Sequence, residues 1–164
     1  MRRIIRALTT VVVCSSLAAA VNADEEGNTF ISFASPPTVK ATQLPDGKTH
    51  ALTEASGFTV ADDPASVFNK LRITCRITIV EGSGDEGVIF EYVTCDAVDL
   101  DGDMVFMYGK ADAPAPAVLS LVGGTGKFAG ATGEIDTAGA SDSYAEGSAI
   151  FPWTVKWIKL VSSE

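Results

Sequence analysis

The sequence contains a single histidine, His50, and no Gly-x-Ser-x-Gly motif. A Ser-His-Asp hydrolase needs a histidine beside its nucleophile, whereas His50 follows a Pro-Asp-Gly turn, so this class is disfavoured. The histidine and the two cysteines beyond residue 23 do not form a zinc ligand set with recognisable spacing. We therefore expect no metal site and no bound cofactor.

The first 23 residues have the pattern of a secretory signal peptide. Arg2, Arg3 and Arg6 form a basic start, an apolar stretch follows to Ala20, and small residues precede a cleavage point after Ala23. Arg6 and several Ser and Thr residues interrupt the stretch, which makes it short for a bilayer-spanning helix of about 20 residues. We expect cleavage after residue 23, export to the periplasm or beyond the cell, and no stable membrane insertion afterwards.

Basic residues are scarce in the expected mature chain. Removing residues 1–23 leaves nine Lys and Arg against 21 Asp and Glu, a net charge of −12. Such a surface repels nucleic acid and anionic lipid headgroups, so neither is expected as a partner. Residues 24–164 are one domain's length and can bury a core without help.

No long stretch beyond Asp24 has helical apolar spacing. Short runs rich in Val, Ile, Thr and aromatic residues recur between Gly, Pro and Asp clusters, which is typical of an antiparallel all-β domain. About eight such strands favour an antiparallel eight-stranded barrel, because closure removes exposed edges; a two-sheet sandwich is the alternative. The expected strands cover residues 29–34, 50–53, 57–61, 69–80, 88–98, 104–108, 117–122, 130–137 and 144–160.

Strict alternation in LRITCRITIV predicts that one face of this strand is buried. If the strand forms a hairpin with VIFEYVTCDAV about a centre at Asp85, Cys75 faces Cys95 and Ile79 faces Glu91. Directly opposed cysteines in an oxidising compartment favour a disulfide. Two buried thiols are the alternative.

The stretch LVGGTGKFAGATGEI raises the question of a phosphate site. A phosphate loop needs Gly where Leu121 stands and Ser or Thr where Phe128 stands. A dinucleotide loop opens a helix, but the glycines that follow have no helical period. We interpret the stretch as a tight turn, a bulge and a strand bend in which glycines allow positive φ.

Asp99, Asp101 and Asp103 resemble the start of a calcium loop, because oxygen ligands at alternate positions can converge on a hard cation. The twelfth position is Lys110 rather than glutamate, and Gly102 stands at the wrong place. A hairpin turn is the preferred interpretation, with weak surface calcium binding as the alternative.

Glu91 is the candidate catalytic residue. It falls on the same face of its strand as Ile89, Val93 and Cys95, and such apolar neighbours would raise the pKa of its carboxyl through desolvation. The alternative is a rim position where the carboxylate reaches water.

In FPWTVKW, alternation places Phe151, Trp153, Val155 and Trp157 on one face, which either fills a barrel or lines a cavity. The candidate walls for an apolar ligand, on more than one expected face, are Phe90, Tyr92, Phe106, Trp153 and Trp157.

Four features together resemble bacterial extracytoplasmic members of the allene oxide cyclase and dirigent barrel superfamily. They are LPDG, the cysteine pair Cys75 and Cys95, DLDGD followed by MVFMYG, and GGTGKFAGATG, and the resemblance runs from about Leu44 to Trp157. It implies an eight-stranded antiparallel barrel, often trimeric, whose lumen takes an apolar small molecule.

Plant members of this superfamily steer cyclisation of a fatty-acid epoxide or orient phenoxy radicals without a cofactor, but their catalytic residues do not match this sequence one by one. The leading hypothesis is a secreted, cofactor-free barrel that binds an apolar small molecule and promotes its cyclisation or isomerisation by orientation. The alternatives are a non-catalytic carrier and a structural or interaction barrel with a filled core.

Overall fold

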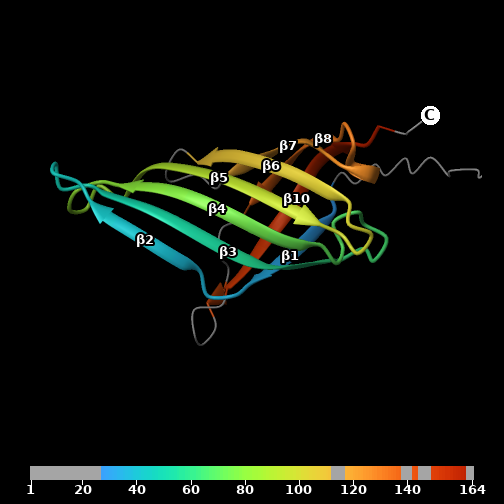
Figure 1. Cartoon of the computed structure of the whole chain (residues 1–164), viewed down its shortest axis with the longest axis horizontal. Helices are drawn as coiled ribbons and strands as arrows, with labels where there is room; N and C mark the ends of the chain where they lie inside the picture. The colour runs from blue at the N-terminus through green and yellow to red at the C-terminus, as the bar shows by residue number, and fades with distance from the viewer. Residues whose placement is uncertain (1–26, 112–116, 138–141, 144–148, 162–164) are drawn as a thin grey trace, which may run out of the picture.

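Strands make up nearly all the regular structure of the chain in the computed structural model (Figure 1). The structure describes residues 27–111, 117–137, 142–143 and 149–161; the expected signal peptide, residues 1–23, lies outside these ranges. Within them no helix is long and apolar enough to cross a membrane. The strands are β1 (Thr29–Ala34), β2 (Thr38–Gln43), β3 (Thr49–Ala61), β4 (Arg72–Glu81), β5 (Val88–Val98), β6 (Met104–Ala111), β7 (Val118–Gly124), β8 (Thr132–Thr137), β9 (Asp142–Ser143) and β10 (Ala149–Lys159), with a short 3-10 helix, η1 (Gly126–Phe128).

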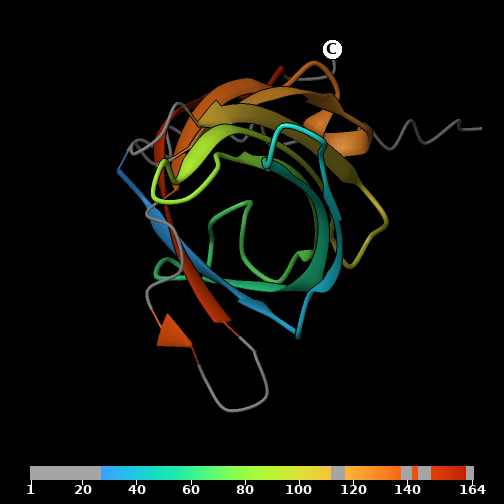
Figure 2. The ribbon, with the colours of Figure 1, turned by 90° about the vertical axis from the view of Figure 1, so that its left-hand side faces the viewer.

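The barrel closes because β1 pairs along both of its edges. Antiparallel neighbours run β10, β8, β7, β6, β5, β4 and β3, and β1 joins β10 to β3. Phe30 lies opposite Trp153 on one side and Ala61 on the other. Viewed end-on, the strands form a ring (Figure 2). The expected all-β, antiparallel eight-stranded barrel is confirmed.

β2 and the two-residue β9 were not expected; β2 lies outside the ring and pairs with the first half of β3. β1 and β2 follow one another along the same edge of β3, separated by Ser35, Pro36 and Pro37. Proline has no N–H for the ladder, so Pro36 and Pro37 interrupt the pairing. β3 itself is continuous, whereas the sequence suggested two strands.

The hairpin of β4 and β5 has the expected register. Cys75 lies opposite Cys95, Ile77 opposite Val93, and Ile79 opposite Glu91. Cys75 and Cys95 form a disulfide with a Cα–Cα distance of 4.1 Å. The bridge therefore crosslinks the two strands of this hairpin within the barrel wall.

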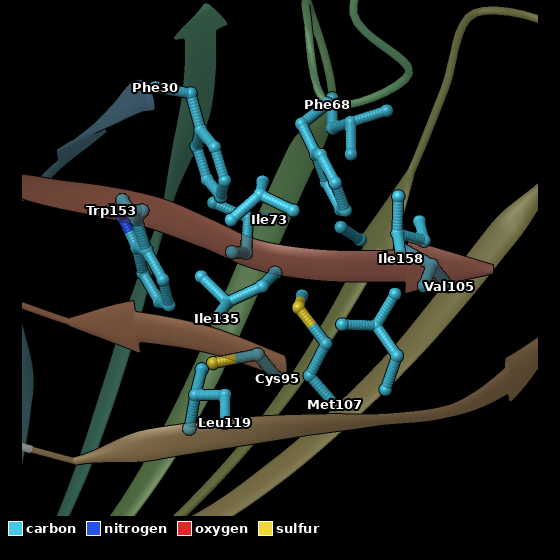
Figure 3. Close-up of a cluster of buried hydrophobic side chains, with 14 of the residues drawn as sticks. Phe30, Phe68, Ile73, Cys95, Val105, Met107, Leu119, Ile135, Trp153 and Ile158 are labelled. Carbon is cyan, nitrogen blue, oxygen red and sulfur yellow. The ribbon is translucent and has the colours of Figure 1, made fainter. Parts of the chain in front are cut away.

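The core is densest at one end of the barrel. Phe68, in the segment between β3 and β4, is fully buried, as is Phe128 in η1. The Thr59 hydroxyl donates to the carbonyl of Phe68 and accepts the N–H of Leu71, which holds this segment across the barrel end. Phe30 stacks on Phe68 at 5.1 Å and on Trp153 at 5.6 Å between ring centroids (Figure 3). This stack continues the core towards the middle of the barrel.

The glycine-rich stretch after β7 is a turn that is joined to the turn between β5 and β6 by an ion pair and a hydrogen bond, contacts that we call the turn lock. The Lys127 ammonium lies 2.8 Å from the buried carboxylate of Asp99, and the N–H of Lys127 donates to Asp103 at 3.0 Å. The other oxygen of Asp99 accepts the N–H groups of Asp101 and Asp103. Burial favours the neutral form of Asp99, but Lys127 and these N–H groups outweigh it and lower the pKa of its carboxyl. Lys127 and the aspartates thus hold two turns together.

Gly126 is the tightest point of this lock. Its φ is +50°, and a Cβ there would lie 1.7 Å from Oδ1 of Asp103. Gly84 has a similar φ of +62°, but a Cβ at that position would meet no described atom within 4 Å.

We expect Gly84→Ala to lower the free energy of unfolding by about 1–2 kcal/mol through backbone strain alone. Gly126→Ala should lower it by roughly 1 kcal/mol more, because Asp103 must also move from the N–H of Lys127. Urea unfolding measures both, and equal losses would contradict the lock.

The disulfide closes a loop with a sequence separation of 20. We expect the double substitution Cys75→Ala and Cys95→Ala to lower the free energy of unfolding by about 3 kcal/mol, because the reduced unfolded chain has more conformational freedom. Urea unfolding with and without reductant checks this. The wild type should shift on reduction and the double variant should not; a shift in both would point to some other effect of the reductant.

Candidate ligand-binding cavity

A partly open cavity of about 100 Å³ lies inside the barrel, away from the end filled by Phe68 and Phe128. Its lining includes residues near the end of β8 and near the starts of β5, β7 and β10, which share the opposite end of the barrel, and residues of β1, β3 and β4. Apolar atoms form most of its surface. The lining residues are Ser32, Ala55, Ser56, Gly57, Ile73, Cys75, Ile77, Glu91, Val93, Ala117, Leu119, Thr137, Phe151 and Trp153.

Glu91 lines this cavity from β5 and is half-buried. Burial raises the pKa of its carboxyl, as the alternation of β5 led us to expect. Among the described residues nothing donates a hydrogen bond to it, and it is the cavity's single titratable side chain because Cys75 is in the disulfide. A protonated Glu91 could give a proton to a bound molecule, and an ionised one could remove a proton. Its role as the catalytic residue stays a prediction.

Ser32 and Trp153 form a polar contact in the wall. Ser32 points into the barrel from β1 and is 4% exposed, and Trp153 is 5% exposed. The indole Nε1–H of Trp153 donates to Oγ of Ser32 at 2.8 Å. Figure 3 shows the indole at the edge of the labelled cluster, next to Phe30, on which it stacks. The contact fixes the orientation of the indole, whose ring forms part of the cavity surface.

Of the five aromatic residues expected to line a ligand site, the structure brings only Trp153 to the cavity together with Glu91. Phe90 and Phe106 are each 38% exposed, on the outward side of β5 and β6. Tyr92 packs on Tyr108 outside the barrel, with ring centroids 6.4 Å apart. Phe90, Tyr92 and Phe106 alternate with residues of β5 and β6 whose side chains point into the barrel and are buried. The buried residues are Val93, Cys95, Val105 and Met107.

Trp157 faces outward for a different reason. The register of β10 against β8 shifts between Val155 and Trp157, so Lys156 is an extra residue in the strand. The phase of alternation changes there: Val155 and Ile158 are buried, whereas Trp157 is 43% exposed. Strict alternation placed Trp153 and Trp157 on one face, and the bulge separates them.

Sequence reasoning missed Ser32. In TFISFA both faces of the strand carry apolar residues, so alternation gives no reason to place the serine inside. The signal for Ser32 is its register instead: it lies opposite Thr59 of β3 and Phe151 of β10, next to the pair formed by Phe30 and Trp153. Such a register depends on barrel closure, which the sequence does not specify residue by residue.

Other candidate sites fit less well. A larger groove of about 300 Å³ lies on the outer face over β2, β3 and β4, but Arg76 there is paired with Glu54 at 3.0 Å and with Asp96 at 3.2 Å. Across the described ranges, no group of three or more His, Cys, Asp or Glu side chains could hold a metal ion. Asp99 pairs with the Lys127 ammonium and accepts N–H groups of its own turn, and Asp103 accepts the backbone N–H of Lys127.

The raised pKa of Glu91 gives a pH dependence that can be measured. Below the ordinary glutamate value of 4.5 the carboxyl is protonated in both the folded and unfolded chains. As the pH rises above 4.5 the unfolded chain ionises first, so the wild type loses stability until the pH passes the folded-state pKa. We therefore compare the stability of Glu91→Gln minus that of the wild type at two pH values. We expect this difference to be more favourable to the variant at about pH 7.5 than at about pH 4.

Thermal unfolding at the two pH values measures this difference. Glu81→Gln, an exposed glutamate at the end of β4, is the matched control and should show no comparable gain. A Glu91→Gln stability difference that is the same at both pH values would mean that the folded barrel does not disfavour the carboxylate.

Comparison with known proteins supports the fold. A scan against protein-family models finds no match, and a search of curated protein sequences finds none either. Among solved structures, the pterocarpan synthase dirigent protein GePTS1 is similar, with a TM-score of 0.51 and 15% sequence identity over 93% of this chain and 100% of that chain. A likeness at this identity concerns the backbone. The chain therefore has the antiparallel barrel fold of the dirigent proteins.

Proposed function

We propose that this chain is an exported, cofactor-free barrel that binds an apolar small molecule in its lumen and promotes its cyclisation or isomerisation. The observation that carries the proposal is the apolar cavity with a single carboxyl, Glu91, in its wall. Because burial raises the pKa of that carboxyl, it can exchange a proton at a higher pH than an ordinary glutamate. Orientation by the cavity walls would supply the rest of the rate enhancement.

The cavity supports ligand binding over a purely structural barrel. A barrel of eight strands is just wide enough for side chains to fill it or for one small ligand to enter. Here large side chains such as Phe68 and Phe128 occupy one end, while small residues such as Ala55, Gly57 and Ala117 line the other. Small residues in the wall keep that space open.

The size of the cavity limits its occupant. A cavity of about 150 Å³ holds benzene, and drug-sized ligands need about 300–1,000 Å³. At about 100 Å³, this cavity is smaller than the benzene-binding one, so a ring fits only if part of the molecule extends through the open end of the barrel. We therefore expect a compact apolar molecule, or the apolar end of a longer one.

The name of the solved neighbour describes a synthase as well as a dirigent protein, so a catalytic role has a precedent in this fold. Its catalytic groups are not transferred to this chain. In the present chain we assign to Glu91 the donation or removal of one proton, or the positioning of a water molecule.

A non-catalytic carrier is the second candidate, and one observation favours it. Glu91 is the single titratable group among the cavity-lining residues, so the cavity offers no acid–base pair. A carrier would use the same apolar walls and leave the bound molecule unchanged. The two candidates differ in turnover and agree in binding.

Export is part of the proposal. The signal-peptide pattern in residues 1–23 supports it, and so does the disulfide between Cys75 and Cys95, since disulfides persist in oxidising compartments. An apolar ligand is also compatible with the strongly acidic mature chain, because Glu91 is the one charged residue that lines the described cavity. Trimer formation, which the family resemblance implies, remains a proposal.

Native mass spectrometry of the mature protein, purified from its own compartment, tests ligand binding. We expect a bound small molecule, and we expect Ala55→Leu to lose it, because the larger side chain fills the cavity from β3. Ser120→Leu adds a leucine on the outward side of β7 and should keep the ligand. A molecule that binds Ala55→Leu as well as the wild type would not be in the lumen.

Once the bound molecule is identified, Glu91→Gln separates the enzyme from the carrier. Loss of turnover with retained binding would support the proton-transfer role. Turnover that is unchanged in Glu91→Gln would remove Glu91 from the mechanism, and the absence of any turnover in the wild type would favour the carrier.

A further inference from the structure

The hydroxyl of Ser32 has an unused donor inside the barrel. A serine hydroxyl has one hydrogen to donate and two lone pairs to accept. One lone pair takes the Nε1–H of Trp153 at 2.8 Å. Trp153 has no side-chain acceptor, so Ser32 cannot donate back to it. Among the described residues nothing accepts the Ser32 O–H, although Ser32 is only 4% exposed.

The other hydroxyls of the cavity wall already have partners. Thr137 donates to the carbonyl of Ala117 at 2.8 Å, and Ser56 shares a hydrogen bond of 3.0 Å with Thr74. Buried polar groups are almost always hydrogen-bonded, because leaving one without a partner carries the full cost of its desolvation. A molecule in the cavity is therefore the available acceptor for Ser32.

The hydrogen bond from Trp153 also makes Ser32 a better donor. When a hydroxyl oxygen accepts a hydrogen bond, its own O–H becomes more polarised, and the effect is larger in a surrounding of low polarity. The walls around Ser32 include the rings of Phe151 and Trp153 and the side chain of Ile73. Trp153 also fixes the position of the oxygen, since its ring is stacked on Phe30 at 5.6 Å.

We propose that Ser32, held by Trp153, is the hydrogen-bond donor that recognises an acceptor oxygen on the ligand, such as a carbonyl or ether oxygen on an otherwise apolar molecule of about one ring. This inference rests on the proposed function and adds the chemical class of the ligand to it. Ser32 is a binding residue, and Trp153 is the positioning residue that acts through it.

Ser32 and Glu91 approach the cavity from different walls. β3 and β4 separate β1 from β5 along the shorter way round the barrel. A ligand whose oxygen lies at Ser32 therefore extends its apolar body across the lumen towards the side from which Glu91 projects. The cavity then distinguishes the two ends of a bound molecule, which an all-apolar wall could not do.

Two probes of the same shape test the inference with the mature, disulfide-bonded protein: acetophenone, which has an acceptor oxygen, and ethylbenzene, which lacks one. We expect Ser32→Ala to weaken acetophenone binding about threefold to tenfold, the contribution of one neutral hydrogen bond, and to change ethylbenzene binding by less than about twofold. The infrared carbonyl stretch of bound acetophenone should move to higher wavenumber in Ser32→Ala, because the hydrogen bond is lost.

Ser120→Ala is the matched control, because it makes the same change on the outward side of β7, and it should alter neither probe. Ser32→Ala leaves the buried N–H of Trp153 without an acceptor and could unfold the barrel. The double variant Ser32→Ala with Trp153→Phe removes both partners, and it should show the same selective loss of acetophenone binding in a folded protein.

The outcomes separate the inference from the proposed function. If both probes bind the wild type, and neither Ser32→Ala nor the double variant changes the ratio of their dissociation constants or the carbonyl stretch, the Ser32 donor is overturned and the ligand-binding lumen stands. If neither probe binds the wild type, a lumen for ring-sized ligands is overturned together with the donor.

Discussion

The pairing of β1 with both β3 and β10 is the interaction on which the rest of the structure depends. Without it the remaining strands would be an open sheet with two exposed edges, and no lumen would exist. The strand that closes the barrel also contributes to the cavity, because β1 supplies Phe30 to the core and Ser32 to the cavity wall. Its register also brings Trp153 within hydrogen-bonding distance of Ser32. β1 therefore both closes the barrel and forms part of the cavity wall.

The filled end of the barrel allows the other end to stay hollow. A large aromatic side chain buries about 150–250 Å² of surface, and Phe68 and Phe128 are fully buried at the filled end. The segment carrying Phe68 is held by hydrogen bonds to Thr59, and η1 carrying Phe128 is held by the ion pair of Lys127 with Asp99. Two turns therefore supply core side chains from the same end. The stack of Phe68, Phe30 and Trp153 carries this packing as far as the cavity.

Local alternation predicted those parts of the fold in which one face of a strand is continuously apolar. The β4–β5 hairpin is such a case, and from it came the register, the disulfide of Cys75 with Cys95 and the inward position of Glu91. β2 was missed because all six of its residues are exposed, so TVKATQ has no buried face to reveal it. Ser32 was missed because its burial depends on the pairing of β1 with β3 and β10. Tyr92 and Phe106 were placed at the cavity from their size, whereas their phase within β5 and β6 directs them outward.

The bulge in β10 shows how one extra residue decides which side chains of a strand face the inside of the barrel. Gly133 of β8 lacks the Cβ that would lie 2.6 Å from the carbonyl oxygen of Trp157, so β10 can approach closely where its register shifts. On the C-terminal side of the shift, Ile158 takes the inward position and Trp157 turns outward. Trp153 precedes the shift and stays inside, where its N–H reaches Ser32. If β10 had no bulge, Trp157 would also point into the barrel, and its indole would lie at the filled end. The bulge places an isoleucine there instead. The one indole that stays inside, Trp153, lies at the cavity, where its N–H donates to the buried hydroxyl of Ser32.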